Sequence, residues 1–274
     1  MRFVAPARDA VDADVFLRPP LSQWSGYADL LRGDWPGMVA LNARLPDVSV
    51  RFVAQTPELL ADGLHYEQRI FERGEIATRE RNWHDLLNAL VWLRHPRLKR
   101  ALNARQVAEI ARVGTKQRSR VQQALTHFDE AGIIVALRDP ALLARWDLHD
   151  WPGLFWREHA AWSDGRIEAI VFGHALLEHA LKPAQMLTGK ALVVLLQQNA
   201  NVENALDVTA AAIREGRALN DPQELRPLPL SGIPGWHAGN DDEGFYRKAP
   251  CFMPLREGRM YPHPLGNNNL HPCI

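Results

Sequence analysis

The sequence predicts an α+β fold: a mostly helical single domain around a small mixed or antiparallel sheet, with an irregular, proline-rich C-terminal tail. Segments with apolar residues at helical spacing interleave with short β-branched runs, without the regular βαβ rhythm of a parallel sheet. Apolar residues make up 46% of the 274 residues, the usual share for a packed core. No Gly/Ser-rich linker divides the chain. We therefore expect residues 1–220 to form the core domain and residues 221–274, which hold nine of the 19 prolines, to pack on it as an irregular segment.

The N-terminal part is predicted to be helical first and extended afterwards. Residues 22–31 and 36–44 carry apolar residues at helical spacing, and each segment is bounded by Gly, Pro or Asp. Residues 48–53 alternate polar and apolar side chains, which indicates a strand. Residues 66–79 are typical of a β-hairpin whose loop has Gly74 in the left-handed conformation.

The middle of the chain predicts helices followed by buried strands. Asn82 opens a helix, with Asp85 as part of its cap, and His95-Pro96 stops it. Two more helices are expected between residues 101 and 131. Residues 132–137 then form an apolar strand after a helix-terminating glycine.

The same unit recurs further along. Residues 167–172 predict a strand that leads through Gly173 into a helix ending at Lys182-Pro183, and residues 191–196 predict another strand. A last amphipathic helix is expected over residues 202–215.

Charge and composition exclude several classes of protein. The 32 Lys and Arg residues balance 32 Asp and Glu residues, so the chain lacks the positive field of a bulk nucleic-acid coat protein. No apolar run approaches the roughly 20 residues that cross a bilayer, and charged residues interrupt the N-terminal segment where a secretory signal would lie. The two cysteines, Cys251 and Cys273, lack metal-ligand spacing. We expect a cytoplasmic protein with reduced thiols and no membrane partner.

Familiar catalytic motifs are missing. The sequence has no G-x-G-x-x-G after a strand, no G-x-x-x-x-G-K-[ST] loop and no G-x-S-x-G elbow. Rossmann, P-loop and α/β-hydrolase interpretations therefore lose support.

The first candidate site lies on the helix that follows Asn82. Apolar residues spread around most of that helix, which implies burial on several sides. His84 and Asn88 share one face, and buried polar groups without partners cost about 1–3 kcal/mol each. These two side chains therefore need partners or a solvent-filled cleft. A hydrogen-bonded core histidine, with Asp85 as helix cap, is the structural alternative.

Two further clusters bring carboxylates and imidazoles. Asp129 and Glu130 lie in the last turn of a predicted helix, where the helix dipole disfavours negative charge, so a cation, an arginine or water must compensate. His174 and Glu178 lie one turn apart after a strand, a spacing that ligates a metal or pairs a base with its orienting carboxylate. Solvated surface acids and an ordinary i,i+4 pair are the alternatives.

Residues 94–120 form a basic segment with nine Lys and Arg against one acid, Glu109. Its pattern around Gly114 is similar to a winged helix-turn-helix, although the register is imperfect. A polyanion site and a solvated basic face are the two interpretations.

One block of sequence resembles a known family. Asn82-Trp83-His84-Asp85, together with residues 88–92, resembles a bacterial family called domain of unknown function 3025. The likeness spans about residues 15–255 and includes residues 128–130, 172–174, 189–190 and 232–236. The resemblance implies no specific activity. It does imply that the helix-turn-helix pattern is embedded in a larger fold.

The sequence favours an enzyme whose cleft gathers these polar residues. Metal-assisted hydrolysis of a small anionic substrate is the reaction that suits two histidines and three carboxylates best. A histidine is expected to act as the base, and a carboxylate to orient it or to ligate a divalent metal. The catalytic candidates are His84, His174, Glu178 and Asp129. The metal candidates are His84, His174, Glu178, Asp129 and Glu130. The substrate-binding candidates are Arg79, Asn88, Lys190 and Trp236.

Two other classes of function stay open. A nucleic-acid-binding or regulatory protein would use residues 94–120, and its binding would weaken steeply with salt. A scaffold or partner-binding protein would use Trp236 and the tail as its contact surface. The sequence specifies no oligomeric state.

Overall fold

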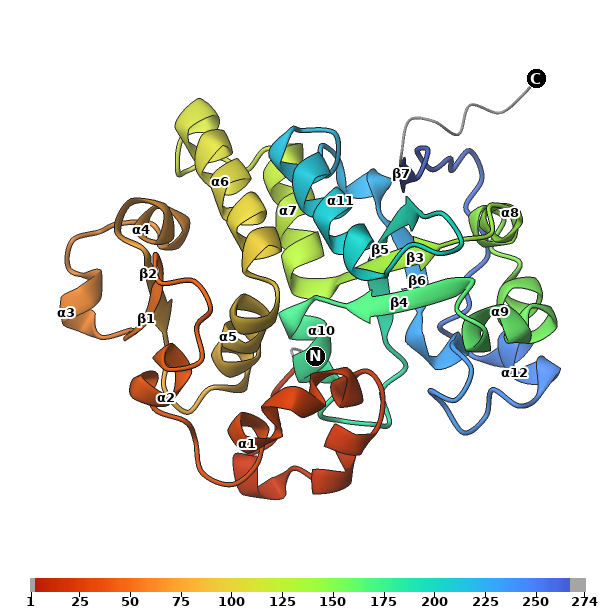
Figure 1. The fold of residues 1–274 in the computed structure, drawn as a ribbon, viewed down its shortest axis with the longest axis horizontal. Helices are drawn as coiled ribbons and strands as arrows, with labels where there is room; N and C mark the ends of the chain where they lie inside the picture. The colour runs from red at the N-terminus through yellow and green to blue at the C-terminus, as the bar shows by residue number, and fades with distance from the viewer. Residues whose placement is uncertain (1–2, 267–274) are drawn as a thin grey trace.

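A five-stranded mixed sheet lies at the centre of the structure (Figure 1). The computed structural model describes residues 3–266. The strands follow the order β4-β3-β5-β6, and β7 pairs with β5 beside this path. β5 runs parallel to β3 and β7, whereas β4 is antiparallel to β3 and β6 is antiparallel to β5. The strands are β3 (Gly132–Leu137), β4 (Ile167–Val171), β5 (Thr188–Leu195), β6 (Arg226–Pro229) and β7 (Leu265–Gly266).

The central strand β3 is buried on both faces. Its residues 133–137 are each 0% exposed, and helices α7 (Arg120–Ala131) and α11 (Glu203–Arg214) pack on the sheet. The edge strand β4 is covered by one side chain from the N-terminal region. Gln23 donates to the carbonyl of Ala169 over 2.8 Å and accepts from the amide of Val171 over 3.0 Å. This amide side chain satisfies edge groups that would otherwise be open to pairing with another chain.

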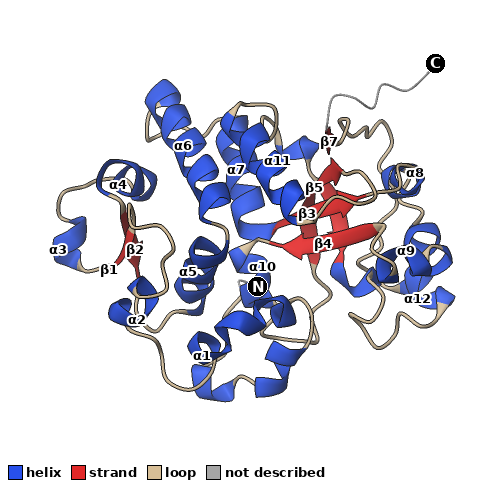
Figure 2. Cartoon of the chain, in the orientation of Figure 1, coloured by secondary structure: helices blue, strands red, loops and turns tan. Residues whose placement is uncertain are grey.

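A layer of helices lies beside the sheet (Figure 2). Helix α5 (Trp83–Arg94) begins after Asn82, whose side chain accepts from the amide of Asp85 over 3.1 Å. Helix α6 (Pro96–Val113) follows at once, because proline fits the first turn of a helix but disfavours helical backbone in the residue before it. The predicted cap and the predicted stop at His95-Pro96 are therefore both confirmed, as are the strands at 132–137 and 167–172.

The predicted hairpin over residues 66–79 is wrong. Residues Tyr66–Arg73 form helix α4, and β2 (Glu75–Thr78) instead pairs in parallel with β1 (Arg51–Ala54). The left-handed conformation of Gly74 was expected, with φ of 66°, but it ends a helix instead of closing a hairpin. A Cβ at this glycine would lie 2.3 Å from the carbonyl oxygen of Ser49, so the close approach of these segments also requires glycine.

The other elements are short and surround this core. Residues before β1 form η1 (Arg8–Ala10), η2 (Ala13–Leu17), η3 (Leu21–Tyr27), α1 (Ala28–Leu31) and α2 (Met38–Asn42), and α3 (Pro57–Leu60) follows β1. Between β3 and β5 lie α8 (Ala141–Asp147), η4 (Pro152–Arg157), α9 (His159–Ser163) and α10 (His174–His179). Within residues 3–266, no helix combines the length and apolar character needed to span a bilayer.

The C-terminal segment is more ordered than the proline content suggested. It contributes β6 to the sheet and also forms η5 (Pro222–Glu224), η6 (Leu230–Gly232) and α12 (Glu243–Lys248). Pro227 and Pro229 are tolerated because β6 ends the strand order. The sequence also predicts a loose segment at Asn267-Asn268-Asn269, which lies outside the described residues.

Candidate functional site

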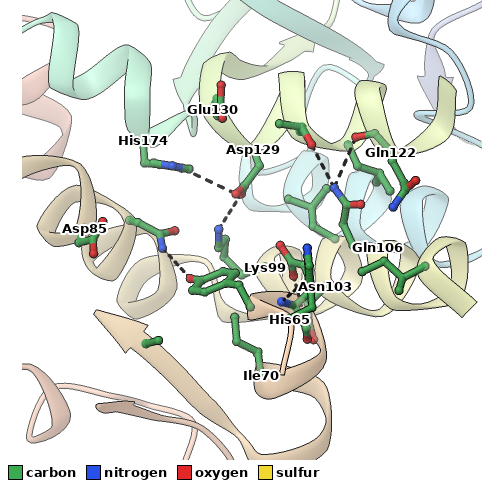
Figure 3. Close-up of a pocket in the computed structure, with 18 of the residues that line it drawn as sticks. His65, Ile70, Asp85, Lys99, Asn103, Gln106, Gln122, Asp129, Glu130 and His174 are labelled. Atoms are coloured by element: carbon green, nitrogen blue, oxygen red, sulfur yellow. Dashed lines mark hydrogen bonds and ion pairs between the residues drawn. The ribbon is translucent and has the colours of Figure 1, made fainter. Parts of the chain in front are cut away.

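A pocket of about 360 Å³ opens between helices α4, α5, α6 and α7 (Figure 3). Helices α5, α6 and α7 each supply polar side chains about one turn apart, so that they share the face toward the pocket. The polar lining includes Tyr66 and Glu67 from α4, His84, Asn88 and Trp92 from α5, Lys99, Asn103 and Gln106 from α6, Gln122, Thr126 and Asp129 from α7, and His174 from α10. The volume suits a small molecule.

Two histidines and a glutamate form a hydrogen-bonded chain at one end of the pocket. His84 Nδ1 lies 3.0 Å from Glu178 Oε2, and His84 Nε2 lies 3.0 Å from His174 Nε2. The side chain of His84 is 34% exposed, whereas that of His174 is buried at 6%. The accessible imidazole thus sits between a carboxylate and a buried imidazole.

Gly173 allows helix α10 to deliver His174 to this position. A Cβ there would lie 2.5 Å from the carbonyl oxygen of Glu130 and 2.5 Å from Cα of Ala131. The amide of Gly173 also donates to the carbonyl of Gly132 over 2.8 Å. The start of α10 therefore lies directly against the end of α7, which explains why glycine precedes His174.

The two histidines differ in charge. The hydrogen bond to Glu178 raises the pKa of His84 above its ordinary value of 6.5. Burial lowers the pKa of His174 to about 3, so this ring stays neutral. With a proton on both nitrogens, His84 donates through Nδ1 to Glu178 and through Nε2 to His174. His174 is then left with a proton on Nδ1, the nitrogen 3.8 Å from Asp129 Oδ2.

A buried ion pair continues the chain beyond His174. Lys99 Nζ donates to Asp129 Oδ1 over 2.6 Å, and both His174 and Lys99 point toward this carboxylate (Figure 3). Burial, the largest single influence, would raise the pKa of Asp129, but the charge and hydrogen bond of Lys99 together with the neighbouring His174 and His84 outweigh it, and that pKa is lowered. Asp129 is therefore ionised, and its charge faces the Nδ1 side of His174.

The opposite side of the pocket holds a carboxyl group that the sequence analysis missed. Asn103 Nδ2 donates to Glu67 Oε2 over 2.6 Å. Burial raises the pKa of Glu67 to about 7. Tyr66, beside it, is hydrogen-bonded by Asn88 Nδ2 over 3.0 Å, and burial raises its pKa as well. The sequence did carry a signal for the neighbouring α6, because Lys99, Asn103 and Gln106 are spaced i, i+4 and i+7 and so lie on one face of this helix.

Three buried polar atoms of the pocket residues lack a hydrogen-bond partner among the described residues. They are Asn88 Oδ1, Trp92 Nε1 and His174 Nδ1. Such orphan groups are rare in native proteins, because each costs about 1–3 kcal/mol. Three of the seven such atoms found among the described residues belong to this one pocket, which makes it a candidate ligand site.

The structure brings most of the predicted site residues together. His84, His174, Asp129 and Asn88 line the pocket, and Glu178 contacts it through His84. Glu130 is exposed at the rim, in the last turn of α7.

The other three predicted substrate-binding residues have different surroundings, and their role stays a prediction. Arg79 lines the pocket, but its guanidinium is held by Asp85, with Nη2 2.7 Å from Oδ1. Lys190 lies on β5, away from the pocket lining, and Trp236 lines a separate hollow together with Arg18 and Lys182.

Four of the five predicted metal ligands form a row in the order Glu178, His84, His174 and Asp129, whereas Glu130 lies at the pocket rim. In the part of the chain that the structure describes, no group of three or more His, Cys, Asp or Glu side chains has an arrangement that could hold a metal ion. Asp129 is committed to Lys99, and His84 to Glu178 and His174. Metal binding stays a prediction.

The basic segment 94–120 is largely neutralised within the fold. Arg97, Lys99, Arg100, Arg112 and Arg120 each form an ion pair with an acidic side chain. The helix that would enter a nucleic-acid groove, α7, packs instead against the sheet and α6. Polyanion binding stays a prediction, which the salt dependence of binding would test.

A family model matches this part of the chain. The family described as "Protein of unknown function (DUF3025)" matches residues 50–256, a span that includes every residue of the pocket. The search of curated proteins and the search of solved structures found no match.

Proposed function

The chain belongs to the DUF3025 family, and from the pocket within the matched span we propose that it is a hydrolase in which His84 donates a proton to the leaving group of a small anionic substrate. One observation carries the proposal. A half-exposed imidazole with a raised pKa is held by a carboxylate on one nitrogen and turns its other nitrogen toward a neutral imidazole.

The roles follow from the hydrogen-bonded chain. Glu178 accepts the Nδ1 proton of His84 and favours the imidazolium, the form that also has a proton on Nε2. His174 accepts this proton when no substrate is bound. A substrate atom that takes the place of His174 Nε2 would receive it instead. Since a raised pKa suits a proton donor, His84 is assigned as the acid and not as the base that the sequence suggested.

Asp129 and Lys99 are assigned a positioning role. The ammonium of Lys99 keeps Asp129 ionised, and this carboxylate faces the Nδ1 side of His174. A carboxylate there favours the tautomer of His174 that has its proton on Nδ1. Its Nε2 lone pair is then left to accept from His84.

An arginine at the pocket rim replaces the predicted anion-binding residues. Among the cationic side chains that line the pocket, Lys99 and Arg79 are engaged by Asp129 and Asp85. Arg118 is exposed and has no ion pair within residues 3–266. Its guanidinium is suited to bind a carboxylate or phosphate. The amides of Asn88 and Asn103 suit the remaining polar groups of such a substrate.

A panel of small carboxylated esters, carboxylated amides and phosphomonoesters tests the proposal by release of the leaving group. We expect His84→Gln to lower turnover of any substrate found by about 100-fold or more, the usual contribution of a general acid. The matched control is His159→Gln, an exposed histidine outside the pocket. Hydrolysis that survives His84→Gln unchanged would refute the assignment.

Elemental analysis of protein purified without a histidine tag separates this mechanism from its metal-assisted form. Stoichiometric metal that is lost in His84→Ala or His174→Ala would establish the predicted metal site. Turnover by metal-free protein would establish acid–base catalysis alone.

A further inference from the structure

The mechanism above leaves one pocket carboxyl group without a task. Glu67 reaches the pocket from α4. Glu178 lies on the opposite side of the pocket, on α10, and acts through His84 on α5. Asn103 binds it twice, through Glu67 Oε2 at 2.6 Å and through the Glu67 carbonyl at 2.8 Å. An amide donor holds the carboxyl group in place without neutralising its charge.

No cation within residues 3–266 forms an ion pair with Glu67. The charged groups that face it are Asp129 from α7 and Lys99 from α6, and Lys99 is committed to Asp129 at 2.6 Å. On its own helix the neighbour is the phenol of Tyr66, itself bonded by Asn88 from α5. A carboxyl group that is enclosed, oriented and unpaired in a pocket has the surroundings of a general base.

We propose that Glu67 is the general base of the same reaction, taking a proton from the attacking water while His84 protonates the leaving group. This inference rests on the proposed function. Burial and the charge of Asp129 raise the pKa of Glu67 to about 7, while Asn103 and Lys99 oppose the shift. Near neutral pH a substantial fraction of Glu67 is therefore ionised, and its carboxylate is a stronger base than an ordinary one.

The step balances without a further reactant. The carboxylate of Glu67 takes one proton from water as the water oxygen forms a bond to the acyl carbon. The bond from that carbon to the leaving atom breaks, its electron pair stays on the leaving atom, and this atom takes the Nε2 proton of His84. Glu67 then releases a proton to solvent, and His84 regains one. One water molecule is consumed.

The pair of groups predicts a substrate class. A dedicated proton donor matters only where the leaving atom is too basic to depart as an anion. Alkyl esters and amides have such leaving groups, whereas p-nitrophenyl esters do not. We therefore infer that the substrate is a small carboxylated amide or alkyl ester.

Two half-esters of succinate test this assignment, because monomethyl succinate and mono-p-nitrophenyl succinate share the acyl group and the free carboxylate. We expect His84→Gln to lower kcat/KM by about 100-fold or more for the methyl ester and by less than about tenfold for the p-nitrophenyl ester. We expect Glu67→Gln to lower kcat/KM by about 100-fold or more for both esters. The control is Glu72→Gln, an exposed position on the same helix.

Chemical rescue separates catalysis from structure. Formate should raise the activity of Glu67→Ala at least about tenfold, because a small carboxylate can occupy the vacated space. It should leave the activity of His84→Gln unchanged. Full activity of Glu67→Gln beside impaired His84→Gln would overturn the role of Glu67 and leave the proposed function intact. Full activity of His84→Gln would overturn the proposed function itself. Absence of wild-type turnover of both half-esters would overturn the substrate class.

A measurement without substrate completes the test. The ¹³C signal of the Glu67 carboxyl, assigned by its loss in Glu67→Gln, should titrate near pH 7. Titration in the range of an exposed glutamate would overturn the assignment of Glu67 as the base.

Discussion

The sheet core and the pocket lie on two sides of helix α7 and follow opposite rules. Toward the sheet this helix turns Ala124 and Phe128, each 0% exposed and apolar. Toward the pocket it turns Thr126 and Asp129. One helix therefore supplies apolar packing on one face and charge on the other.

The difference shows which region is shaped by stability alone. In the core, apolar side chains cover strands whose backbone groups are paired in the ladders. In the pocket, buried polar atoms stay unpartnered and a carboxylate is ionised beside a neutral histidine. Well-packed apolar residues would often be equally or more stable there. Local departures from these rules are expected at functional sites.

The largest expected effect is a loss in the free energy of unfolding when a side chain of the sheet core is shortened. Ile134 is 0% exposed in the middle of β3, so Ile134→Ala should lower the free energy of unfolding by about 2–5 kcal/mol through lost burial and a cavity. Chemical denaturation measures this change. The conservative variant Ile134→Val should cost only about 0.5–1.5 kcal/mol. Equal and small effects of both variants would contradict a tightly packed core.

The core was the more predictable region, because its signals are local in the sequence. The apolar run at residues 132–137, the Asn82 cap and the break at His95-Pro96 each depend on neighbouring residues and were confirmed. The hairpin over residues 66–79 failed because a single left-handed glycine fits both a hairpin loop and a helix end. Only the pairing partner of β2 decides between these alternatives.

The pocket was predictable in part. Polar residues one turn apart on an apolar helix drew attention to His84 and Asn88, and the His174/Glu178 spacing gave the second half of the chain. Glu67 was missed because it lies in the misassigned hairpin. Lys99 was missed because it lies in the basic segment 94–120, which was interpreted either as a polyanion site or as a solvated basic face. Their roles depend on contacts with Asn103 and Asp129, which no sequence spacing reveals.

The Lys99–Asp129 ion pair tests how the pocket differs from the core, because each of its charges is stable in the fold only while the other is present. Lys99→Met should lower the free energy of unfolding by about 2–3 kcal/mol, because Asp129 would be left buried without its cation. Thermal and chemical denaturation of the single variants and of Lys99→Met/Asp129→Leu measure the coupling. The double variant should recover much of the loss, since the uncompensated charge is gone. Simply additive losses would mean that the pair behaves like ordinary core packing.

The smallest expected effect concerns the pH dependence of the His84–Glu178 pair. The folded-state pKa of His84 is raised above the unfolded value of about 6.5, so the folded protein binds a proton more tightly than the unfolded chain. The stabilisation is therefore fully present below about pH 6.5 and is lost as pH rises through the folded-state pKa.

Glu178→Gln isolates this contribution, because it removes the charge that raises the pKa of His84 and keeps the shape of the side chain. The variant should lower the free energy of unfolding by about 0.5–1 kcal/mol at pH 6, since a partly exposed ion pair is screened, and by less at pH 9. NMR titration of the imidazole should show the pKa of His84 shifted downward. A titration of His84 that is indifferent to Glu178 would show that the carboxylate does not set its charge. The pocket would then lack the feature that distinguishes it most from the core, a histidine whose pKa is raised by the carboxylate that the fold places beside it.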